Sequence, residues 1–155
     1  MELIRNLQEG EFGLEGEAYF QHFSTYIKVY ADEEANEAYI KICAEYMNSL
    51  DANIIEALCK ASIRYCNDFL KMTGQPERGF AQLGDVLKLI QPNSLIVPDP
   101  ENGNEPVVHL ELECEWEVEH GMEWLVRSGE VLYVGGFNDV NEWGNYSEKA
   151  SYNYA

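Results

Sequence analysis

Glutamate alternates with apolar residues from Val108 to Glu119, and this alternation is the clearest chemical pattern in the chain. The odd positions are His109, Glu111, Glu113, Glu115, Glu117 and Glu119. The even positions are Leu110, Leu112, Cys114, Trp116 and Val118. Because successive side chains of a strand point to opposite faces, the pattern predicts one long strand with an apolar face and a carboxylate face. Burial of the apolar face fixes the register, since a slip of one residue would bury the carboxylates.

Three interpretations of this carboxylate face remain open: a solvated outer face of an antiparallel sheet, a recognition surface for a basic protein, or part of a metal site. Same-face carboxylates stand roughly 6.7 Å apart along a strand, which is wide for a cation whose ligands lie at about 2.0–2.6 Å. His120 or Glu123 would have to complete a metal site. The spacing is also too sparse to imitate DNA, which carries a charge about every 1.7 Å, unless Glu123 and Glu130 add theirs.

Other reactive residues follow no established pattern. The chain has no Gly-x-Ser-x-Gly elbow, no Gly-x-Gly-x-x-Gly or Walker motif and no EF-hand loop. We therefore assign no catalytic, cofactor-binding or metal-ligating residues, and we expect no cofactor. An alternative is a small-ligand site or an active site around His120, placed at the turn that ends the long strand, with Glu119, Glu123 and Trp124. The aromatic residues Trp143 and Tyr146 in the polar C-terminal segment are expected interface anchors.

Composition narrows the classes of partner. The 155 residues include 28 Asp and Glu against 10 Lys and Arg, a formal net charge of −18. Nucleic-acid binding is excluded because it needs clustered basic residues, and docking on an anionic membrane is disfavoured. The charge favours a basic protein partner, a bound cation or simple solubility. With no signal-peptide pattern, no long apolar stretch and four cysteines without metal-site spacing, we expect a cytoplasmic protein with buried thiols.

The elements that must position these residues form one α+β domain over residues 1–155. The expected order is a β hairpin in 1–31, an antiparallel helix pair in 33–72, a proline-rich connection with a short strand in 73–106, a β meander in 107–136 and an irregular tail in 137–155. Asp51 is the expected N-cap of the second helix. A tight turn is expected at Arg127 to Glu130. The antiparallel sheet, formed by the hairpin and the meander, packs against the helix pair.

Two segments resemble a family of small, acidic, uncharacterised bacterial proteins, a domain of unknown function. The first is AEYMNSLDANIIEALCKASIRYCNDFL, and the second is LECEWEVEHGMEWLVRSGEVLYVGG. The most specific parts are a Glu-Trp-x-x-Glu-His-Gly-Met-x-Trp run that ends at Trp124 and a Val-x-Tyr-Val-Gly run that ends at Gly135. The resemblance covers roughly 25–136, leaving the first 20 and the last 19 residues outside. It implies no enzymatic activity, and it suggests a loose association with toxin–antitoxin conflict.

We therefore expect a non-enzymatic, acidic protein-interaction module, such as an immunity protein that neutralises a basic toxin. Electrostatic complementarity would speed its association with the toxin. The expected surface is the carboxylate face with its neighbouring histidine and tail aromatics: Glu111, Glu113, Glu115, Glu117, Glu119, His120, Trp143 and Tyr146.

Overall fold

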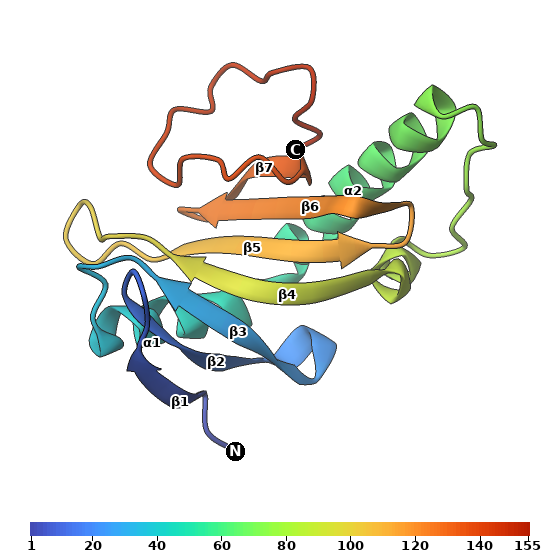
Figure 1. Ribbon diagram of the computed structural model, residues 1–155. Helices are drawn as coiled ribbons and strands as arrows, with labels where there is room; N and C mark the ends of the chain where they lie inside the picture. The colour runs from blue at the N-terminus through green and yellow to red at the C-terminus, as the bar shows by residue number, and fades with distance from the viewer.

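Seven strands form one continuous sheet whose order in space follows the chain, as the computed structural model of residues 1–155 shows (Figure 1). The elements are β1 (Ile4–Glu9), β2 (Leu14–Phe20), η1 (Gln21–Phe23), β3 (Thr25–Ala31), α1 (Glu37–Asn48), α2 (Ala52–Met72), η2 (Leu83–Leu89), β4 (Ile90–Val97), β5 (Val107–Cys114), β6 (Glu117–Arg127) and β7 (Glu130–Gly136). All neighbouring strands are antiparallel except β3 and β4, which are parallel. Parallel neighbours need a long crossover, and here the helices supply it.

Both long helices lie behind the sheet in Figure 1, so one face of the sheet carries no helix. The main contacts of α1 are with β5, β2 and β4, whereas those of α2 are with β7 and η2. The two helices therefore cover different parts of the sheet, and the expected packing of one helix along the other is not among the main contacts. The α+β class and the mostly antiparallel sheet are confirmed.

Side-chain caps fix the first turn of both long helices, and the cap expected at Asp51 for the second helix is confirmed. The Asp51 side chain accepts a hydrogen bond from the Ile54 amide and caps α2, and the Asn36 side chain caps α1 in the same way. Gly74, at φ 74°, follows the end of α2. No helix is long and apolar enough to cross a membrane. All four cysteines are free and buried, as expected.

The N-terminal region contains three strands rather than the hairpin expected in residues 1–31. β1, β2 and β3 form an antiparallel meander, and η1 fills the link between β2 and β3. Because β3 also pairs with β4, this meander and the one formed by β5, β6 and β7 belong to the same sheet.

The prediction of a single strand from Val108 to Glu119 is wrong. β5 ends at Cys114, a two-residue turn follows, and β6 begins at Glu117, so the last two glutamates of the pattern lie on the next strand. The alternation continues in the sequence through the turn residues Glu115 and Trp116. In the structure Cys114 and Glu117 are direct cross-strand partners on one face, so the reversal changes which residues of the alternation face which side. Val118, expected on the apolar face, is 80% exposed.

The expected turn at His120 and Gly121 is also wrong, because both residues lie within β6. Gly121 has φ 71°, and an added Cβ would lie 2.5 Å from the carbonyl oxygen of Leu112 on β5. The pairing of β5 with β6 shifts register just beyond Leu112. Glycine here permits an irregular, close approach of two strands. The tight turn at Arg127 to Glu130 is present as expected.

Candidate functional site

The helix-free face carries two cross-strand rows of side chains near its centre. In the first row, Glu111 of β5 pairs with Ser94 of β4 on one side and with Glu123 of β6 on the other. In the next row, His109 lies between Ile96 of β4 and Leu125 of β6. The two rows bring a histidine and two carboxylates onto the middle strands of the sheet.

The segment that follows β7 covers part of this face and buries two of these polar residues. His109 and Glu123 are completely buried, although an imidazole and a carboxylate at those positions of a bare sheet face would be exposed. The covering segment, residues 137–146, contains no helix or strand. Two of its carbonyl groups, those of Glu142 and Gly144, accept hydrogen bonds from the Arg127 guanidinium. The Arg127 guanidinium, at the end of β6, therefore holds this segment in place over His109 and Glu123.

His109 is held between two carboxylates from opposite directions. Its Nε2 atom is hydrogen bonded to the Glu123 carboxylate. Its Nδ1 atom lies 2.7 Å from Oε2 of Glu142, which comes from the covering segment. Burial disfavours the charged imidazole, but the hydrogen bonds and negative charges of these two carboxylates outweigh burial and raise the pKa of His109. The raised pKa favours the imidazolium form of this buried ring, which links the sheet to the tail.

The Glu123 carboxylate is further held by the backbone of the covering segment. Oε1 accepts a hydrogen bond from the Asn138 amide at 2.8 Å, and Oε2 accepts one from the Val140 amide at 2.9 Å. Asp139, between these two residues, has φ 49°, a conformation that Asp tolerates better than most residues. Alternate amides around one anion form a backbone nest, which compensates the burial of the carboxylate.

The part of the helix-free face that the tail leaves open is hollowed into a groove. Two adjoining hollows, of about 440 and 430 Å³, share Tyr30, Ser94 and Glu111 and run from β2 to the tail. We call this region the sheet-face groove, and it is lined by Glu17, Tyr26, Ile27, Lys28, Tyr30, Asp32, Gln91, Pro92, Asn93, Ser94, Ile96, Glu111, Phe137, Asp139, Val140, Asn141 and Glu142. Burial raises the pKa of Asp32, and the nearby charges of Asp99 and Glu142 raise it further.

The predicted carboxylate face is dispersed in the structure. Glu111 lines the sheet-face groove, and Glu113 is exposed further along the same face of β5. Glu115, in the turn, forms an ion pair with Arg78 at 3.0 Å. The Glu117 carboxylate accepts hydrogen bonds from the backbone of the next residues and pairs with His120 Nδ1 at 2.9 Å. Glu119 is exposed on β6. The five glutamates therefore do not form one row.

The four residues of the alternative ligand site do not converge. Glu123 points into the cluster on the helix-free face, whereas Trp124 is buried on the opposite face, where its Nε1 donates to Ser62 of α2 at 3.0 Å. Glu119 and His120 are exposed beyond the irregularity in β6. The expectation of one site built from these four side chains is wrong, because neighbouring residues of a strand face opposite sides.

The tail aromatics fold back onto the protein. Trp143 is partly buried, its Nε1 donates to the carbonyl of Asp99 at 3.1 Å, and the Arg127 guanidinium lies 5.9 Å from its ring centroid. Tyr146 is also partly buried, and its hydroxyl donates to the Asn141 carbonyl at 2.7 Å. Both rings help to fix the segment that covers His109.

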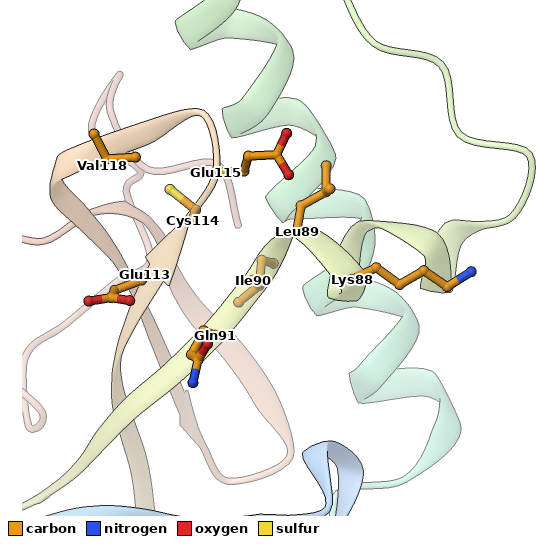
Figure 2. Close-up of a pocket in the computed structure, with 8 residues that line it drawn as sticks. All are labelled: Lys88, Leu89, Ile90, Gln91, Glu113, Cys114, Glu115 and Val118. Atoms are coloured by element: carbon orange, nitrogen blue, oxygen red, sulfur yellow. The ribbon is translucent and has the colours of Figure 1, made fainter.

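A further hollow of about 380 Å³ lies where β4 and β5 approach η2 and the β5–β6 turn (Figure 2). Figure 2 shows that its eight labelled side chains come from these neighbouring elements, with the Glu113 and Glu115 carboxylates well separated. Burial raises the pKa of the Cys114 thiol to about 12. A thiol whose pKa is raised in this way is a poor nucleophile or metal ligand.

Sequence reasoning missed the cluster around His109. It placed His109 on the carboxylate face of one long strand, whose role it left open, and it treated Glu142 as part of an irregular tail. No local pattern links the two, because 33 residues separate them. The isolated histidine among glutamates was the one available signal.

Comparison with known proteins gives one match. The model of the family described as Domain of unknown function (DUF6985) matches residues 4–141. The match begins earlier and ends later than the expected resemblance over 25–136, so most of the N-terminal meander is part of the shared domain. No curated protein and no solved structure matches the chain.

Proposed function

The chain belongs to the DUF6985 family, and we propose that it binds a basic segment of a partner protein along the sheet-face groove. The observation that carries this proposal is the charge of the groove. Its acidic residues are Glu17, Asp32, Glu111, Asp139 and Glu142, and its one basic residue is Lys28. Clustered charge of one sign attracts a partner of the opposite sign and steers its approach.

Apolar and aromatic groups between the charges supply contact area for the same segment. Tyr30, shared by both hollows, is 41% exposed, although large apolar side chains are usually more buried. Pro92 and Ile96 also line the groove. Exposed tyrosine is enriched where proteins bind one another. A segment that alternates arginine or lysine with apolar residues matches this arrangement of carboxylates and rings.

The biological role that we propose is the neutralisation of a basic toxin, as an immunity protein does. The net charge of −18 supports this role because it favours rapid association with a positively charged protein. The surface differs from the one expected from sequence. Of the alternating glutamates only Glu111 lies in the groove, and acidic residues from β2, the β3–α1 link and the tail supply the remaining charge.

The test is binding of a fluorescently labelled peptide that alternates arginine with leucine, measured by anisotropy. The double variant E17Q/E111Q should bind more weakly, by about 1.5- to 5-fold for each charge removed, because exposed charge pairs contribute about 0.2–1 kcal/mol. Added salt should weaken binding to the unaltered protein, since these charges are screened.

The matched control is E45Q/E56Q, which removes the same charge from exposed positions on α1 and α2, behind the sheet. This control should bind the peptide as the unaltered protein does once salt is moderate. Equal weakening by both double variants would show a general charge effect and would overturn the groove as the binding site. Equal affinity of the unaltered protein for a peptide that alternates glutamate with leucine would also overturn the groove as a site for basic segments.

A further inference from the structure

The buried cluster on β5 and β6 combines residue types that bind metal ions. A ring nitrogen of His109 and carboxylate oxygens of Glu123 and Asp139 all lie within 4.8 Å of one another. Histidine nitrogen and Asp or Glu oxygen are both ligands of zinc in proteins, and imidazole also suits other divalent transition metals. We propose that His109, Glu123 and Asp139 bind one divalent transition-metal ion, with zinc as the reference ion, at the tail-covered end of the sheet-face groove.

The orientation of His109 agrees with this assignment. A metal-binding histidine usually donates its second ring N–H to a carboxylate, which fixes the tautomer and the direction of the ring. Glu142 occupies that position, because its Oε2 lies 2.7 Å from Nδ1 of His109. Nε2 faces the Glu123 carboxylate and is the nitrogen left for a metal. A bound ion would take the place of the proton on Nε2, and that proton would pass to solvent.

The carboxylates are held in place without losing the capacity to bind an ion. A carboxylate offers about four lone-pair positions, and the amides of Asn138 and Val140 occupy one on each oxygen of Glu123. These amides come from the residues on either side of Asp139, so one short segment positions both carboxylate ligands. Positioned supporting contacts are what a metal site requires beyond its ligands.

The charge of the surroundings favours a cation. Neither Glu123 nor Asp139 forms an ion pair with a lysine or an arginine, and the one ion pair of Glu123 is with His109. The adjoining hollow is lined by further acids, Asp32 and Glu111, and by no basic residue. A bound divalent ion would offset this excess of negative charge.

The site also has a route from solvent. Asp139 is exposed, and it lines the hollow of about 430 Å³ together with Glu142. An ion can therefore reach the cluster without displacement of the sheet. Water from the hollow can fill the remaining coordination position, as in zinc sites with three protein ligands and one open position.

The experiment is a calorimetric titration of the untagged full chain with Zn²⁺, after a chelator has removed any bound metal. We expect stoichiometric binding of one ion per chain. D139N should weaken this binding at least tenfold, and because Asp139 is exposed its change should leave the fold intact, which circular dichroism checks. E142Q should weaken it by about 10- to 100-fold, the usual effect of changing a residue that orients a metal ligand. X-ray absorption should show one imidazole nitrogen at about 2.0–2.1 Å among oxygen ligands.

The matched control is H120Q, which removes a histidine that pairs with a glutamate on the surface of β6. This variant should bind Zn²⁺ as tightly as the unaltered chain. Absence of stoichiometric binding, or full binding by a folded D139N variant, would overturn the proposal. An absorption spectrum with no imidazole ligand would also overturn it. Because the titration contains protein and metal alone, its outcome is independent of the peptide-binding test.

Discussion

Glu111 and Glu123 are direct cross-strand partners on β5 and β6, yet solvent reaches only Glu111. The difference comes from the segment after β7, which covers Glu123 and supplies two backbone amides to its carboxylate. Glu111 lies just outside this cover, where its carboxylate lines the sheet-face groove. One sheet face therefore contains a buried carboxylate with three hydrogen-bond partners next to a solvent-accessible one.

This contrast predicts unequal effects of the same substitution at the two positions. E123Q should lower the free energy of unfolding by about 2–4 kcal/mol, because it removes a buried charge that pairs with His109 and accepts two backbone amides. E111Q should change it by no more than about 0.5 kcal/mol. Urea denaturation in the presence of a chelator measures both values. Equal losses would contradict the distinct roles assigned to the two glutamates.

The close approach of β5 and β6 at Gly121 predicts a steric effect of substitution. G121A should lower the free energy of unfolding by about 2–4 kcal/mol. Its Cβ would lie 2.5 Å from the Leu112 carbonyl oxygen, and its φ of 71° is unfavourable for alanine. G129A is the matched control, since Gly129 has φ 70° but open space around the added Cβ. G129A should lower the free energy of unfolding by only about 1 kcal/mol. Urea unfolding midpoints that shift equally in the two variants would exclude the steric effect.

The pair formed by Glu117 and His120 predicts a pH dependence at the surface. The hydrogen bond and charge of Glu117 raise the pKa of His120 above its ordinary value of 6.5. A raised folded-state pKa means that the stabilisation from this pair is fully present below the unfolded pKa and is lost as pH rises through the folded pKa. NMR titration of the His120 ring should show a midpoint above 6.5.

Variants separate the contributions to that midpoint. E117Q should lower the His120 midpoint, because it removes the hydrogen-bonded carboxylate. E119Q should change it less, since the influence of Glu119 on the His120 pKa is a weaker, longer-range charge effect. A midpoint that does not respond to E117Q would show that the pair is not formed in solution.

Local sequence signals predicted the elements whose cause is itself local. The N-cap at Asp51, the end of the second helix at Met72 and the turn from Arg127 to Glu130 depend on residues within a few positions of one another. The same signals could not detect the reversal after Cys114, because glutamate and apolar residues keep alternating in the sequence through the two turn residues, Glu115 and Trp116. The single strand predicted there is therefore two strands, β5 and β6.

The sequence by itself determined the α+β class, the amphipathic β5 strand, the buried thiols and the excess of negative charge. Alternation, helix periodicity and composition carry that information residue by residue. Only the tertiary structure decided which carboxylates are buried and which are free to meet a partner. His109, Glu123 and Glu142 meet because a tail without secondary structure crosses the sheet. Contacts between residues 14 to 33 positions apart, through loops and turns, leave no periodic trace in the sequence.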